Sequence, residues 1–112
     1  MADPTTIDPA TFAELQDAAG AEFVVELVNT FLEEAPTMLA ELRAAQTAGN
    51  VDGFRRAAHS LKSNSNTFGA TRMGEMARDI ELGGLVANTA PVDALEAEYR
   101  AVASALLELT RD

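Results

Sequence analysis

Residues 51–68 read VDGFRRAAHSLKSNSNTF, and their apolar side chains recur at the period of an α-helix. When the stretch is wound at about 100° per residue, one narrow face carries Phe54, Ala57, Leu61 and Phe68. The opposite face carries Arg55, His59, Lys62, Ser63 and Asn66, with Asp52 and Arg56 beside them. Because a helix of this kind buries its apolar face against neighbouring helices, the stretch predicts a helical domain with His59 on the solvent side.

The rest of the chain has a helical pattern as well. Helices are expected at residues 9–18, 21–47, 51–67, 71–86 and 91–109. No alternating strand pattern, internal repeat or long linker divides the 112 residues, so residues 1–112 are expected to form one domain. Four main helices with short connections predict an all-α fold, an antiparallel four-helix bundle. The short N-terminal helix is expected to cap one end of that bundle.

Local signals mark the helix ends. Asp8 followed by Pro9 is typical of an N-cap and a first helical residue, and Asn50 can cap the helix after it. Pro36 lies inside the second helix, where a kink or break is expected. Gly83-Gly84 should weaken the last turn of the fourth helix. The expected core faces are Met73, Met76, Ala77 and Ile80 on the fourth helix and Val92, Leu95, Tyr99, Val102, Leu106 and Leu109 on the fifth.

The composition excludes several classes of function. A formal net charge of −10 argues against nucleic-acid binding, which needs phosphate neutralisation, and against binding to an anionic membrane. The chain has no cysteine, hence no disulfide framework or zinc-thiolate site. No apolar run approaches the roughly 18 residues that span a bilayer, and the acidic N-terminus lacks the basic segment of a signal peptide. A cytoplasmic protein is therefore expected.

His59 and Lys62 are the only histidine and the only lysine, three residues apart on one helix face. A phosphoryl group at His59 would need space and donors, which Ser63 and Asn66 can supply. The flexible ammonium of Lys62 can follow a moving phosphate more easily than a rigid arginine fork. One histidine is too few for an ordinary zinc site, no calcium-loop spacing appears, and no orienting carboxylate for a catalytic triad is visible. No ATP-binding glycine loop is present, so the phosphoryl group would come from another protein.

The segment from Ala58 to Ala70 resembles the motif of the histidine-containing phosphotransfer domain, the HPt module of phosphorelays. The residues that carry the resemblance are Ala58-His59-Ser60-Leu61-Lys62-Ser63, Asn66 and Phe68-Gly69-Ala70. The stretch FLEEAP at residues 31–36, followed by Leu39 and Leu42, is similar to the long second helix of that family, including its proline. The order of the helices is similar along nearly the whole chain.

The resemblance implies a role for each residue of the motif. His59 would accept a phosphoryl group on its distal ring nitrogen from the aspartyl-phosphate of a receiver domain, and would pass it to another receiver aspartate. An unperturbed imidazole, with a pKa of about 6.5, is mostly neutral at pH 7 and can attack without a strong base. Lys62 would stabilise the phosphate charge. Ser63 stands where the family has Gly or Ser and would leave room for it.

The expected partners are response-regulator receiver domains and a hybrid histidine kinase. The chain would be a monomeric phosphocarrier without its own ATP site, cofactor or metal, and Mg²⁺ would come from the receiver. From the helix geometry rather than the motif, Arg55, Arg56 and Asn66 are candidates for the rim that binds the partner. Both a stand-alone protein and a domain of a larger kinase are compatible with the sequence.

Three other interpretations stay open. A helical adaptor or inhibitor could dock on a kinase or receiver without transferring phosphate, although His59 and Lys62 would then have no chemical role. A dimerising histidine-kinase module usually has an acidic residue directly after the histidine, where this chain has Ser60, and it builds four helices from two chains. A purely structural bundle leaves the pairing of the only histidine with the only lysine unexplained.

Overall fold

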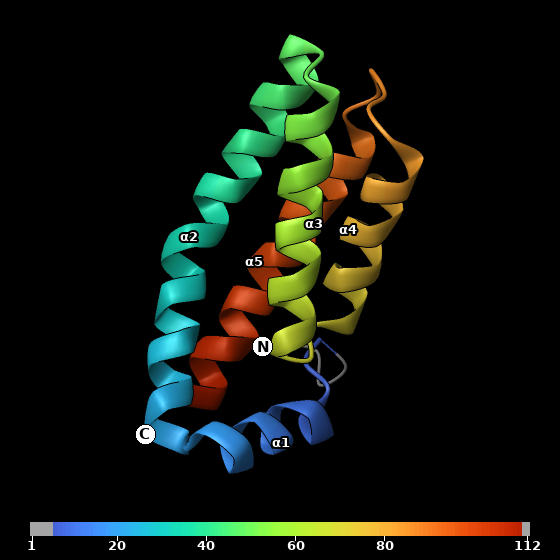
Figure 1. Cartoon of the computed structure of the whole chain (residues 1–112). Coiled ribbons are helices and arrows are strands. Elements are labelled where there is room, and N and C mark those ends of the chain that lie inside the picture. The colour runs from blue at the N-terminus through green and yellow to red at the C-terminus, as the bar shows by residue number, and fades with distance from the viewer. Residues whose placement is uncertain (1–5, 111–112) are drawn as a thin grey trace.

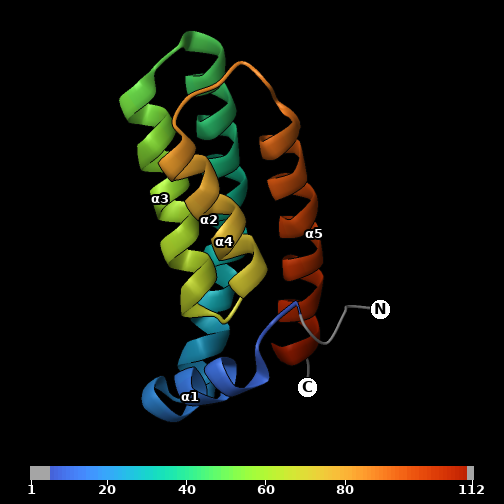
Figure 2. The same cartoon turned by 90° about the vertical axis from the view of Figure 1, so that its right-hand side faces the viewer.

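Five helices make up the protein in a computed structural model, which describes residues 6–110. They are α1 (Pro9–Ala19), α2 (Ala21–Ala48), α3 (Val51–Thr67), α4 (Thr71–Gly83) and α5 (Ala90–Thr110). The last four run up and down along one axis, and α1 lies across one end of them (Figures 1 and 2). The prediction of an all-α antiparallel bundle with a short N-terminal capping helix is therefore confirmed.

The helix α1 is fixed at its start and tied to the turn between α3 and α4. Its N-cap is Asp8, whose carboxylate accepts hydrogen bonds from the Ala10 amide and the Thr11 hydroxyl. The Asp8 amide donates to the Gly69 carbonyl at 2.8 Å. Gly69 has a φ of +81°, which L side chains rarely adopt, and it packs directly on Thr11. The turn that ends the histidine helix is thus held against α1.

Pro36 does not break α2, which runs without interruption through it. A proline in a helix removes one hydrogen bond and crowds the preceding turn. Here the ring is exposed, while Phe31, Ala35 and Leu39 on either side of it are buried in the core. Their packing holds both halves of α2 in one helix and offsets the local cost. Of the expected kink or break, the break is therefore wrong.

The fourth helix is shorter than its sequence pattern indicates, ending at Gly83 instead of residue 86. Gly84, at a φ of +75°, turns the chain away, and its amide donates to the Ile80 carbonyl. The two glycines therefore end α4 rather than weaken its last turn. In α5 the apolar stripe also stops early: Leu109 is 47% exposed because it lies in the final turn, where a helix has fewer packing neighbours.

The core lies between α2, α3, α4 and α5 and includes three aromatic rings in contact. Phe31 is the central ring, with centroids 5.3 Å from Phe68 and 5.9 Å from Tyr99. Met76 and Tyr99 are partly buried and pack against the fully buried residues. Met38 of α2 is also partly buried and packs against the core.

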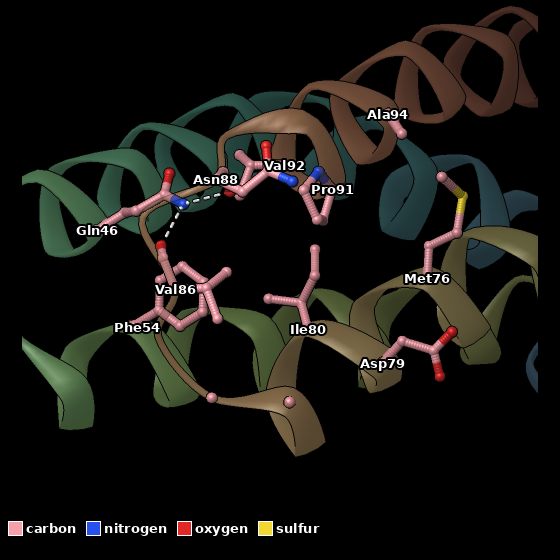
Figure 3. A pocket seen from close by; sticks show the side chains of 12 residues that line it. Gln46, Phe54, Met76, Asp79, Ile80, Val86, Asn88, Pro91, Val92 and Ala94 are labelled. Carbon is pink, nitrogen blue, oxygen red and sulfur yellow. Dashed lines mark hydrogen bonds between the residues drawn. The ribbon is translucent and has the colours of Figure 1, made fainter.

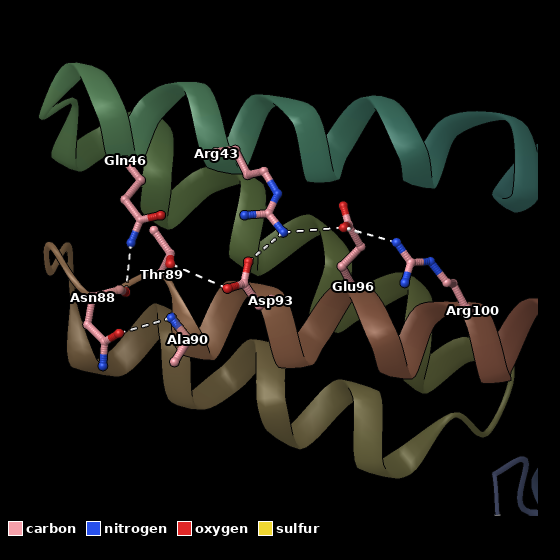
Figure 4. A network of polar contacts seen from close by, with 8 residues as sticks. All are labelled: Arg43, Gln46, Asn88, Thr89, Ala90, Asp93, Glu96 and Arg100. Carbon is pink, nitrogen blue, oxygen red and sulfur yellow. Dashed lines mark hydrogen bonds and ion pairs between the residues drawn. The ribbon is translucent and has the colours of Figure 1, made fainter.

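A polar network links α2 to α5 and to the connection before it (Figure 4). The Arg43 guanidinium lies 2.9 Å from Asp93 and 3.3 Å from Glu96. One turn further along α2, the Gln46 side-chain amide donates to the carbonyls of Val86 and Asn88. These contacts are partly solvent-exposed, so each adds little to stability, but together they define where the α4–α5 connection lies.

Candidate functional site

The candidate site is built around His59, in the middle of α3, whose side chain is 58% exposed. Its Nδ1 atom lies 2.9 Å from Oε2 of Glu81, on α4. The other oxygen of the same carboxylate, Oε1, accepts a hydrogen bond from Lys62 Nζ, also at 2.9 Å. The only histidine and the only lysine of the chain therefore share one carboxylate, which comes from the neighbouring helix.

Close packing of α3 on α4 brings Glu81 within reach. The two helices lie side by side in both views (Figures 1 and 2). At their contact a Cβ on Gly74 would overlap the tip of the Asn66 side chain, which would then have to move aside. The helices form a hairpin about Ala70: Asn66 and Gly74 are each four residues from it, and His59 and Glu81 are each eleven. The seven residues between the two pairs are two helical turns, which explains why both pairs meet.

Glu81 is negatively charged at neutral pH. The hydrogen bond from Lys62 is the largest cause that lowers its pKa below the ordinary 4.5, with a smaller contribution from His59. Partial burial acts in the opposite direction and is outweighed. An ionised carboxylate has no proton to donate, so the hydrogen between it and His59 belongs to Nδ1. The lone pair of the neutral ring is then on Nε2, the nitrogen that makes no contact with Glu81.

An open depression of about 340 Å³ lies beside the imidazole. Its lining consists of Asp52, Arg55, Arg56, His59 and Glu81. Within residues 6–110, Arg55 and Arg56 take part in no ion pair, unlike Arg43, Arg72 and Arg100. Two uncommitted guanidinium groups next to an exposed histidine can attract an anion, in a chain whose net charge is −10.

The residues singled out from the sequence do not all meet in this depression. The Lys62 ammonium contacts Glu81 and does not line the depression. Ser63 is exposed one turn beyond His59 and does not line it either. Asn66 is also exposed, but its side chain lies against Gly74. Arg55 and Arg56 do line the depression with His59. The roles of Lys62, Ser63 and the rim residues stay predictions.

Glu81 is the site residue that the sequence interpretation missed. No carboxylate lies near His59 along the chain in a position to orient it, since Glu81 comes 22 residues later. The signal was present in the hairpin: two helices joined by a short turn, with Gly74 of one helix against Asn66 of the other. Residues that lie equally many positions before and after Ala70 face each other in such a hairpin, and this count pairs His59 with Glu81.

A second hollow, of about 280 Å³, lies between α4 and α5 and is mostly apolar (Figure 3). Ile80, Met76 and Pro91 face into it, with Phe54 at one side. Neither Glu81 nor a histidine is among its lining residues. Among residues 6–110 there is no group of three or more His, Cys, Asp or Glu that could hold a metal ion. Nor is any helix of this part of the chain long and apolar enough to cross a membrane.

Comparison with known proteins identifies the family. A family model for the Hpt domain matches residues 26–105, which cover most of α2 and all of α3 and α4. The chain belongs to the Hpt domain family. The crystal structure of histidine-containing phosphotransfer protein B from Pseudomonas aeruginosa PAO1 is similar, with a TM-score of 0.84, 26% sequence identity and 94% coverage of each chain. No match was found among curated proteins. Hpt domain proteins are phosphocarriers of phosphorelays, in which they work with receiver domains and histidine kinases.

Proposed function

We propose that this Hpt domain accepts a phosphoryl group on Nε2 of His59 from the aspartyl-phosphate of one receiver domain and passes it to the aspartate of another. The observation that carries the proposal is the state of the ring. Its Nδ1 is occupied by Glu81, and the side chain is 58% exposed, so the free lone pair of Nε2 is the one available to a partner.

The transfer needs no general base on this chain. The lone pair of Nε2 attacks phosphorus, the P–O bond to the aspartate breaks, and that electron pair leaves with the carboxylate. The transition state is loose and its charge is spread over the phosphoryl oxygens, so positioning and nearby cations carry most of the catalysis. Lys62, Arg55 and Arg56 are the cations of this chain nearest to His59 along α3. Mg²⁺ and the reacting aspartate belong to the receiver.

The remaining features follow from this role. The carrier has no ATP site and obtains its phosphoryl group from other proteins, namely response-regulator receivers and a hybrid histidine kinase. It acts as a monomer, because one chain supplies all four helices of the bundle. The cytoplasm is its proposed compartment. Residues 1–112 act as one functional domain in this proposal, since the Asp8 amide at the start of α1 donates a hydrogen bond to the Gly69 carbonyl after α3.

The test is a transfer experiment with a receiver domain that carries labelled aspartyl-phosphate in the presence of Mg²⁺. Label should appear rapidly on the wild-type chain, in acid-labile and base-stable form, and should be absent from His59→Gln. Binding of a receiver without any transfer of label would contradict the proposal and point to a docking protein instead.

A further inference from the structure

We propose that Glu81 holds a proton on Nδ1 of the phosphorylated His59 ring and thereby keeps the phosphoryl group transferable. This inference rests on the proposed phosphorylation of His59 at Nε2. It assigns to a residue of α4 the control of how long the phosphohistidine lasts, beyond the orientation of the unmodified ring.

The chemistry of the leaving group is the first reason. When the Nε2–P bond breaks, its electron pair stays on Nε2 and phosphorus passes to an oxygen of a carboxylate or of water. If Nδ1 carries a proton, the departing group is neutral imidazole. If Nδ1 has lost that proton, the departing group is an imidazolate anion, which is a far poorer leaving group. The protonated ring therefore transfers its phosphoryl group, and the deprotonated ring stores it.

The geometry at Nδ1 is the second reason. A ring with phosphorus on Nε2 and hydrogen on Nδ1 carries a positive charge, and the Glu81 oxygen lies 2.9 Å from Nδ1. The Glu81 side chain is only 16% exposed and is anchored through its other oxygen by Lys62. A fixed, poorly hydrated carboxylate at hydrogen-bond distance favours the charged form of its partner more strongly than water does.

The other charged groups around the ring do not duplicate this role. From α3, Asp52, Arg55 and Arg56 line the depression beside His59, and Lys62 contacts Glu81. From α4, Glu81 is the residue in contact. Glu41 of α2 lines the adjoining hollow with Arg56 and not the depression that contains His59. Glu81 is thus the one carboxylate within hydrogen-bond distance of the ring among residues 6–110.

The experiment uses the lifetime of phosphohistidine as a function of pH. Because His59 is the only histidine, phosphoramidate, a small-molecule donor, modifies a single imidazole in the intact chain without any partner protein. Loss of the phosphoryl group is followed by mass spectrometry from about pH 5 to pH 10. The chains compared are wild type, Glu81→Gln, Glu81→Ala, Lys62→Met and the control Glu75→Gln, which removes the same charge from an exposed position on α4.

Both Glu81 variants should move the midpoint of the pH profile toward acid by about one unit, the low end of the effect of a close opposite charge. Above both midpoints their phosphohistidine should last about tenfold longer than that of the wild type. Lys62→Met should move the midpoint the other way, since it removes a competing cation, and Glu75→Gln should not move it. Opposite shifts from two variants of one ion pair exclude general loss of structure as the cause.

Identical profiles for wild type and Glu81→Gln would overturn the inference, as would a shift of equal size in Glu75→Gln. The unmodified ring gives a second readout by ¹⁵N NMR, in which the hydrogen of the neutral wild-type ring should reside on Nδ1. A mixture of the two tautomers in the wild type would also overturn the inference. Failure of the proposed function looks different. In that case phosphoramidate would modify the chain with the expected pH profile, but no receiver would transfer label to it. This result would contradict the relay role and leave the assignment of Glu81 intact.

Discussion

Lys62 Nζ lies 2.9 Å from Glu81 Oε1, so the only lysine of the chain is already paired with a carboxylate before any phosphate arrives. The ammonium is 25% exposed and sits one turn from His59. The ammonium has three N–H donors, so it can contact a phosphoryl group on Nε2 while it still donates to Glu81. A lysine suits this double contact, because its charge is compact and its stem is flexible, whereas the two oxygens of Glu81 would hold an arginine in a fork.

Replacing Lys62 with Met should therefore slow phosphotransfer without unfolding the bundle. Loss of one solvent-accessible cation near the transferring group is worth about 1 kcal/mol, which corresponds to a rate about fivefold lower. Rapid-quench measurement of label transfer from a phosphorylated receiver gives the rate. Lys62→Arg should recover only part of it, and a Met variant as fast as the wild type would remove Lys62 from the mechanism.

Arg55 and Arg56 should contribute mainly to the docking of the receiver. The double change to Glu should weaken receiver binding about tenfold at low salt, because it reverses two charges beside His59. The loss should shrink as ionic strength rises and the Debye length falls toward about 8 Å. Titration by fluorescence anisotropy at two salt concentrations measures it. Arg78→Glu is the control, as Arg78 is exposed on α4 and does not line the depression. It reverses one charge instead of two, so a loss of about threefold there, which is half of the free energy of a tenfold loss, would mean that net charge alone matters.

Much of this fold could be predicted because its signals are local. The bounds of α3 follow from Asn50, whose side chain caps the Gly53 amide, and from Gly69 after its last turn. The break expected at Pro36 is absent for the opposite reason. The cost of a proline is local, but the packing that outweighs it comes from residues on other helices, which no window of sequence contains.

The part of the site that lies on α3 was also predictable from local signals. His59 and its charged neighbours lie on one helix face, and 3.6-residue periodicity is enough to place them together. Glu81 is different, because its contact with His59 depends on the register between two helices. That register depends on the turn at Phe68–Ala70, whose amide hydrogen bonds are local, and on the contact between Asn66 and Gly74, which joins two helices.

Glu81 should also make stability depend on pH. Its folded-state pKa is lowered, first by the hydrogen bond from Lys62, so its ionised form stabilises the native protein. That contribution is present above the pKa of the unfolded chain and is lost as pH falls through the lower folded value. Urea unfolding should show Glu81→Gln less stable than wild type by about 0.5–1 kcal/mol at pH 7, the range of a partly exposed ion pair, with the gap closing below about pH 4. A gap that persists at pH 3 would assign the loss to packing instead.

Leu61 should matter for the fold and not for the chemistry, although it lies between His59 and Lys62 in sequence. Its side chain is fully buried, so Leu61→Ala should cost about 2–5 kcal/mol of unfolding free energy through the cavity it leaves. Leu82→Ala on α4 makes the same change at a side chain that is 68% exposed, and its effect should stay within about 0.5 kcal/mol. Denaturant titration of both variants measures the difference, and comparable losses would contradict the burial of Leu61.

Gly69 tests how firmly the end of the histidine helix is held. An alanine there would be strained at a φ of +81°, and its Cβ would lie 3.0 Å from both the Asp8 carbonyl oxygen and the Thr11 Cβ. Gly49→Ala supplies the control, because Gly49 has a left-handed backbone with a φ of +70° and nothing within 4 Å of the added carbon. The control should lose about 1–2 kcal/mol from backbone strain alone. Gly69→Ala should lose about 1 kcal/mol more by thermal or denaturant unfolding, since α1 must move away from the turn. Equal losses in the two variants would mean that α1 yields freely and does not brace the end of α3.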